Sequence, residues 1–95
     1  MMPGTTYALV EDVPASWDAY LERVEALGGR VPDGLLVHVA GPTDEGFRMI
    51  EIWESKAARE RFRDELRTGD LHRPVRPQDV HTIFREFTVQ SLFLA

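Results

Sequence analysis

His38 and Glu51 are the two side chains in this sequence best suited to moving protons. They lie in two apolar segments, 35–40 and 47–53, which are rich in strand-forming residues and are joined by a short turn. Histidine ordinarily titrates near pH ~6.5, which suits a general acid or base at neutral pH. A neighbouring carboxylate can orient an imidazole and stabilise its charged form. The pair therefore predicts acid–base catalysis, with His38 transferring the proton and Glu51 orienting it, although a buried structural histidine and a rim carboxylate fit equally.

Further residues of the predicted strands could line a pocket for a hydrophobic or aromatic ligand. Tyr7 could donate a hydrogen bond into such a pocket, and Arg85 could face either the pocket or the surface. The complete set of predicted substrate-binding residues is Tyr7, Leu36, Phe47, Met49, Trp53 and Arg85. For the aromatic members, plain packing in a subunit interface is an equally good interpretation.

The composition excludes several other classes of site. The chain has 95 residues and no cysteine, which rules out disulfides, thiolate zinc sites, iron–sulfur clusters and a cysteine nucleophile. His72 and His81 have no second ligand at a metal-binding spacing, and no glycine-rich phosphate loop is present. We therefore predict no metal and no cofactor.

The charge balance and the hydropathy pattern limit the partners. With 16 acidic and 11 basic residues, the formal net charge is −5, which opposes binding to nucleic acid or to an anionic membrane. No segment reaches the ~18 apolar residues of a membrane span, and the first residues lack the pattern of a secretory signal. The expected location is the cytoplasm.

The periodicity of apolar residues predicts four strands and two helices. Trp17, Tyr20, Leu21 and Val24 follow a helical spacing after a possible N-cap at Ser16. A second helix begins after Ser55, and its charged residues form a solvated face. The expected order is strand 5–11, helix 16–27, strand 35–40, strand 47–53, helix 55–67, loop 68–79 and strand 80–89.

This β-α-β-β-α-β order predicts an α+β, ferredoxin-like fold with a four-stranded antiparallel sheet and both helices on one face. The length allows a single domain over residues 1–95. If Gly41 pairs with Gly46 across the hairpin, an aliphatic face forms from Leu35, Val37, Val39, Ile50 and Ile52, and we expect it under the helices.

The opposite face would then hold His38 diagonally across from Glu51 and would remain uncovered. An apolar face of this kind usually marks an interface or a ligand site. We therefore expect a homodimer in which two sheets pack face to face and form an α+β barrel. In this interpretation the site and the dimer interface are the same surface.

Residues 34–48 and 50–55 also carry a family likeness. The His-x-Ala-Gly-Pro pattern at 38–42, the Phe47-Arg48 pair and the Trp-Glu-Ser sequence at 53–55 resemble the small dimeric α+β-barrel proteins grouped with the antibiotic-biosynthesis monooxygenases. That resemblance implies a cofactor-independent monooxygenase of polyketide or other aromatic secondary metabolism. A cyclase or isomerase using the same His38 and Glu51 pair, or a non-catalytic dimeric binding protein, are the alternatives.

Overall fold

The computed structural model describes residues 5–67 and 82–93. Its elements follow the predicted order. They are β1 (Tyr7–Val13), α1 (Trp17–Ala26), β2 (Leu35–Thr43), β3 (Gly46–Trp53), α2 (Lys56–Arg67) and β4 (Ile83–Thr88). The predicted loop 68–79 and the first two residues of the predicted strand 80–89 lie outside the described residues.

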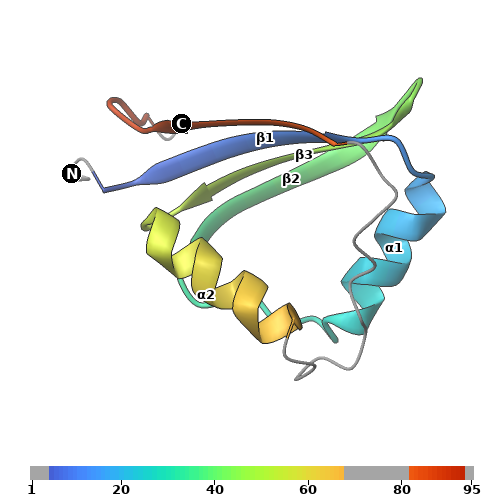
Figure 1. Cartoon of the computed structure of the whole chain (residues 1–95), viewed down its shortest axis with the longest axis horizontal. Coiled ribbons are helices and arrows are strands. Elements are labelled where there is room, and N and C mark those ends of the chain that lie inside the picture. Colours follow the sequence, from blue (N-terminus) through green and yellow to red (C-terminus); the bar gives the residue numbers. More distant parts are fainter. Residues whose placement is uncertain (1–4, 68–81, 94–95) are drawn as a thin grey trace.

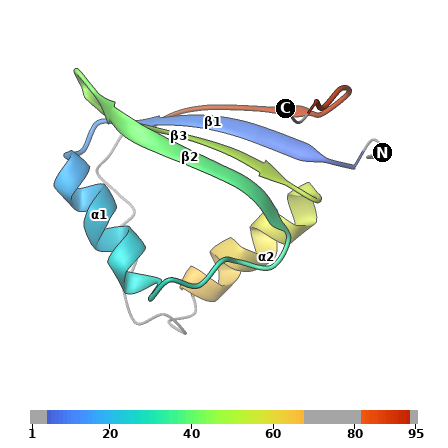
Figure 2. The same ribbon diagram turned by 180° about the vertical axis from the view of Figure 1, so that it is seen from behind.

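The four strands form one antiparallel sheet in the order β2-β3-β1-β4. Both helices lie on the same side of this sheet, as Figure 1 and the reverse view in Figure 2 show. The predicted α+β, ferredoxin-like architecture is therefore confirmed. Neither α1 nor α2 is long and apolar enough to cross a membrane, a statement that covers the described helices only.

Local signals fix where the helices begin and end. The Ser16 hydroxyl accepts a hydrogen bond from the backbone N–H of Ala19 at 3.1 Å and caps α1. The Ser55 hydroxyl accepts in the same way from Ala58 at 3.1 Å and caps α2. After α1 the backbone turns through positive φ angles of 63° and 80° at Gly28 and Gly29, which only glycine adopts without strain.

The hairpin register differs from the predicted one by two residues. Thr43, rather than Gly41, pairs with Gly46, and Gly41 pairs with Arg48. The strand continues through Pro42 because β2 is an edge strand, where a missing backbone N–H breaks no ladder hydrogen bond. The shift places His38 directly opposite Glu51 instead of diagonally.

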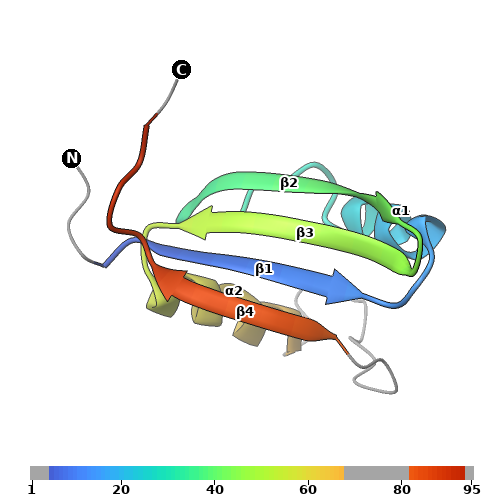
Figure 3. The ribbon, with the colours of Figure 1, turned by 90° about the horizontal axis from the view of Figure 1, so that it is seen from above.

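The two faces of the sheet are also exchanged relative to the prediction. We call the side covered by α1 and α2 the helix face and the other side the open face, which Figure 3 views from above. Phe47, Met49 and Trp53 are buried on the helix face, whereas Val39 and Ile50 remain 53% and 40% exposed on the open face. Most of the aliphatic row therefore lies away from the helices, although Leu35, before the register irregularity of β2, packs against the Trp53 cluster on the helix face. The row with His38 and Glu51 lies beneath the helices.

Aromatic packing explains this choice of face. Trp53 lies 5.9 Å from the ring of Phe62 on α2, and Phe47 packs against Trp17 and Tyr20 of α1. These large rings fill the space between each helix and the sheet more completely than the aliphatic row would. Two separate clusters result, one centred on Trp53 with Tyr7 and the other on Phe47.

Candidate functional site

Four side chains on the helix face form a continuous line of hydrogen bonds. The Tyr20 hydroxyl lies 2.7 Å from His38 Nε2, and His38 Nδ1 lies 2.7 Å from Glu51 Oε2. The Trp53 indole Nε1–H donates to the second carboxylate oxygen, Glu51 Oε1, at 2.9 Å. We call Tyr20, His38, Glu51 and Trp53 the quartet.

The fold brings the quartet together from three elements. Glu51 and Trp53 are two residues apart on β3 and therefore point to the same face. His38 stands opposite Glu51 on β2. Tyr20 comes from the first turns of α1, whose start is set by the Ser16 cap. Sheet register and helix start together set the hydrogen-bond geometry.

Partial burial sets the electrostatics of Glu51. Its side chain is 16% exposed, and that of His38 is 29% exposed. Burial alone would raise the pKa of the Glu51 carboxyl, but the hydrogen bonds from His38 and Trp53 outweigh it and hold the pKa below the ordinary value of 4.5. Glu51 is therefore a carboxylate at neutral pH.

Tyr20 stays protonated for complementary reasons. Burial raises the pKa of its phenol above the ordinary value of 10.0, and the nearby negative charge of Glu51 adds to this effect. The quartet at neutral pH thus contains a phenol, an imidazole and a carboxylate in a row, which is an arrangement suited to proton transfer.

Aromatic rings surround the hydroxyl end of the quartet. The Tyr20 ring stacks on Trp17 with centroids 4.5 Å apart, and it runs nearly parallel to the His38 imidazole with an interplanar angle of 5°. Phe47 closes the group at 5.4 Å from Tyr20. These rings provide a flat apolar neighbourhood for a planar ligand next to the proton-transfer groups.

Tyr7, predicted as a hydrogen-bond donor to the ligand, directs its hydroxyl elsewhere. It donates to Glu86 Oε1 at 2.6 Å, and Lys56 lies 3.3 Å from the same oxygen. Burial and this hydrogen bond raise the pKa of Tyr7 to about 12. The structure thus forms a second polar cluster between α2 and β4, separate from the quartet.

The other predicted ligand-lining residues divide between the two faces. Phe47, Met49 and Trp53 lie on the helix face with His38 and Glu51. Leu36 sits at a register irregularity of β2 and is 40% exposed. Arg85 pairs with Val10 on the open face, so the sheet separates it from the quartet.

The sequence interpretation missed Tyr20 as a site residue. It placed Tyr20 in the apolar stripe of the first helix, where its spacing from Trp17 fits simple core packing. A helix crossing directly over a strand that carries His38 would bring a tyrosine hydroxyl within reach of the imidazole. Only the three-dimensional crossing point of α1 on the sheet reveals that contact.

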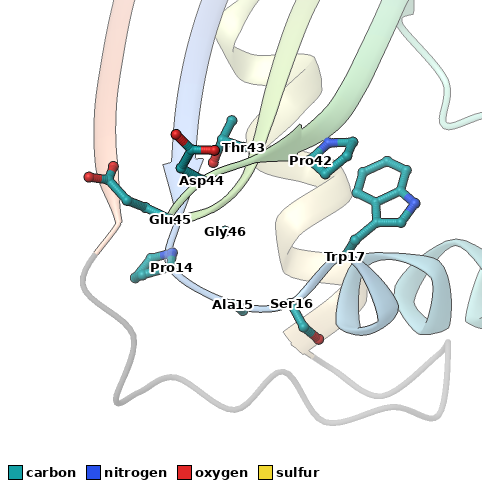
Figure 4. Close-up of a pocket in the computed structure, with 9 residues that line it drawn as sticks. All are labelled: Pro14, Ala15, Ser16, Trp17, Pro42, Thr43, Asp44, Glu45 and Gly46. Carbon is teal, nitrogen blue, oxygen red and sulfur yellow. The ribbon is translucent and has the colours of Figure 1, made fainter.

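A groove of about 420 Å³ borders the aromatic end of the site. It runs between the β1–α1 connection and the β2–β3 turn, and its lining residues, drawn in Figure 4, include Trp17 and Pro42. Since Trp17 also stacks on Tyr20, one indole ring separates the groove from the quartet. A second groove of about 440 Å³ borders the Tyr7–Glu86 cluster.

Comparison of the chain with protein-family models finds no match, and no curated protein matches it. Among the described residues, no group of three or more histidine, aspartate or glutamate side chains is arranged to hold a metal ion. Evidence for the function of this chain therefore comes from the geometry of the quartet and its surroundings.

Proposed function

We propose that this protein is a small cofactor-independent enzyme that removes a proton from a hydrophobic, aromatic substrate. The observation that supports this most directly is the pairing of His38 with an ionised Glu51 at 2.7 Å on the helix face. A carboxylate held against one imidazole nitrogen fixes the tautomer and stabilises the imidazolium that forms when the other nitrogen gains a proton. His38 is the base, and Glu51 is its positioning residue.

The aromatic surroundings favour a planar substrate of the polyketide or polyphenol type. Such molecules contain acidic O–H and C–H groups whose anions are stabilised by the ring system. Trp17 is partly exposed beside the quartet and lines the groove next to it, and stacking against this ring would orient a planar ligand. Proton removal then needs only a correctly placed base, without an added cofactor.

Monooxygenation is the first candidate for the overall reaction, because the sequence around the hairpin resembles the antibiotic-biosynthesis monooxygenases. The substrate anion would react with O₂, so that one oxygen atom enters a ring carbon that loses two hydrogens and the other leaves as water. Cyclisation or isomerisation of the same anion is the alternative, and it needs the same His38 and Glu51 pair but no O₂.

We propose further that two copies of the chain pair through their open faces. This face carries a row of partly or largely exposed apolar side chains across all four strands: Val10, Val37, Val39, Ile50, Ile52, Ile83 and Phe87. Ile83 and Phe87 are 59% and 57% exposed, an apolar area that monomeric proteins seldom leave to water. Sheet-to-sheet packing of a second copy would cover it.

The catalytic proposal can be tested with 5-nitrobenzisoxazole, a neutral planar C–H acid that opens to a coloured phenolate when a base removes its proton. We expect turnover by the wild-type protein and a loss on the order of 10²–10⁴-fold in His38→Gln. Glu54→Gln, a change at an exposed carboxylate outside the quartet, is the control and should leave turnover unchanged. A wild-type protein without turnover contradicts the proposal and favours a non-catalytic binding protein.

The pairing proposal has its own test in the mass of the particle in solution. We expect a dimer for the wild type and a monomer for Ile50→Asp, because a buried unpaired charge in the middle of the open face opposes pairing. Leu21→Asp is the matched control, since Leu21 is 48% exposed on α1 and should leave the dimer intact. A monomeric wild type at the highest soluble concentration contradicts pairing.

A further inference from the structure

Both nitrogens of the His38 imidazole are already engaged in hydrogen bonds within the described residues. Nδ1 faces Glu51 and Nε2 faces the Tyr20 hydroxyl, each at 2.7 Å. A substrate therefore meets no free lone pair on the imidazole. If His38 is the base, its proton must arrive through the group that occupies Nε2.

The Trp53 end fixes the hydrogen-bond directions in the quartet as far as His38 Nδ1, and the last direction follows for the neutral imidazole that a base requires. An indole N–H can only donate, so Glu51 Oε1 accepts from Trp53. Because Glu51 is a carboxylate, its Oε2 accepts as well, and His38 Nδ1 carries the hydrogen. The neutral imidazole then has its lone pair on Nε2, and the Tyr20 O–H donates to it.

We propose that Tyr20 is a catalytic residue whose hydroxyl oxygen takes the substrate proton while its own proton passes to His38 Nε2. This inference rests on the function proposed above and deepens it. The substrate–H bond and the Tyr20 O–H bond break, and a new Tyr20 O–H bond and an Nε2–H bond form. The products are a neutral tyrosine, an imidazolium beside the Glu51 carboxylate, and the substrate anion, so no oxidant or reductant is consumed.

The same geometry limits the class of substrate. When His38 is in the neutral form that a base requires, the quartet carries one negative charge, on Glu51, so an uncharged acid enters with less repulsion than an anion does. The Tyr20 ring stacks on Trp17 and its hydroxyl is held by His38, which directs the remaining acceptor capacity of its oxygen to a fixed point. We therefore assign the site to neutral planar C–H or O–H acids.

A purely structural Tyr20 would act differently. If the hydroxyl only caps Nε2 until a substrate arrives, its removal exposes the lone pair of His38 and preserves or raises the reaction rate. If it transfers the proton, its removal interrupts the path. Tyr20→Phe separates these cases, because the ring that stacks on Trp17 and packs against Phe47 is kept and only the oxygen is lost.

The test compares wild type, Tyr20→Phe and His38→Gln on 5-nitrobenzisoxazole, after thermal unfolding has verified that each variant is folded. We expect Tyr20→Phe to lose on the order of 10²-fold in kcat with little change in KM, within the range of a lost general base. We also expect the wild-type rate to fall linearly with deuterium content in mixtures of H₂O and D₂O, because the Tyr20 hydroxyl proton exchanges with solvent whereas the C–H proton of the substrate does not.

The outcomes distinguish this inference from the proposed function. An inactive His38→Gln beside a fully active or faster Tyr20→Phe overturns the role of Tyr20 and leaves His38 as the base. A wild-type rate that does not depend on deuterium content, which indicates that no exchangeable proton moves with the C–H proton, overturns it as well. A wild type without turnover overturns both proposals together.

Discussion

The variant Glu51→Gln replaces an ionised acceptor by a neutral amide of the same size at the centre of the quartet. In the wild type, the carboxylate accepts from the Trp53 indole and from His38 Nδ1. The Gln oxygen can still accept from Trp53, but its amide nitrogen now faces Nδ1 and can only donate. The imidazole must then move its hydrogen to Nε2, which reverses the direction of the bond to Tyr20.

The size of the effect on stability follows from the hydrogen bonds and from burial. A hydrogen bond to a charged group contributes about 1.5–3 kcal/mol to stability, and one between neutral groups contributes about 0.5–1.5 kcal/mol. Replacing the two hydrogen bonds of the Glu51 carboxylate by neutral ones therefore costs about 2 kcal/mol. The side chain of Glu51 is only 16% exposed, so burial of its charge destabilises the folded wild type. The neutral glutamine removes this desolvation cost, which offsets part of the loss. Because the bonds outweigh burial, we expect a net loss of about 1 kcal/mol, or about 4–8 °C in Tm.

The pKa of Glu51 determines how the stability difference between wild type and Glu51→Gln changes with pH. The pKa of Glu51 is lowered in the folded protein from the ordinary value of 4.5 that the unfolded chain retains. Its contribution to stability is therefore complete above pH 4.5 and is lost as the pH falls through the lower, folded value. The difference between wild type and Glu51→Gln should be largest near neutral pH and should shrink on acidification.

Urea unfolding at several pH values and one fixed protein concentration measures this difference. Glu54→Gln is the matched control, because its side chain is exposed and should show no pH-dependent difference from wild type. Asp12 and Glu86 also have lowered pKa values, but they are present in all three proteins and cancel in the comparison. A variant as stable as wild type at neutral pH, or a difference that widens in acid, would refute the reasoning.

Three further predictions concern the support of the quartet. Trp53→Phe removes one donor from Glu51, so the pKa of that carboxyl should rise, as followed by the carbon-13 shift of the carboxyl group in an NMR titration. Gly34→Ala should cost about 2 kcal/mol or more in urea unfolding, because the backbone has a φ of +92° and an added Cβ would lie 2.6 Å from Ala58 Cβ. Ser16→Ala should cost about 1 kcal/mol by loss of the α1 cap.

Much of the fold was predictable because it depends on local signals. Apolar periodicity, the caps at Ser16 and Ser55 and the glycines after α1 gave the element order, and that order leaves few topologies. The hairpin register was not predictable from glycine positions alone. Pro42, between the predicted strands 35–40 and 47–53, suggested a turn, but at a sheet edge a proline is tolerated within a strand, and the turn lies at Asp44 and Glu45.

The assignment of faces was wrong for a different physical reason. A row of valine and isoleucine was expected beneath the helices because it contains no polar group, whereas the row with His38 and Glu51 contains two. The cost of burying a polar side chain disappears when each polar atom finds a partner. Tyr20 from α1 and Trp53 from β3 supply those partners. The two-residue spacing places Trp53 on the same face as Glu51, but nothing in the sequence spacing reveals the contact with Tyr20.

Because the two faces are exchanged, the candidate site and the proposed dimer interface are different surfaces of the sheet. A site on the dimer interface would make every interface mutation a site mutation, so the two roles could not be separated. In the structure the quartet lies between the helices and the sheet, while the aliphatic row of Val39 and Ile50 lies on the opposite side. A change at Ile50 should therefore alter the mass of the particle without touching the hydrogen bonds of His38. Conversely, Tyr20→Phe should alter proton transfer in a particle of unchanged mass, because α1 contacts only the helix face.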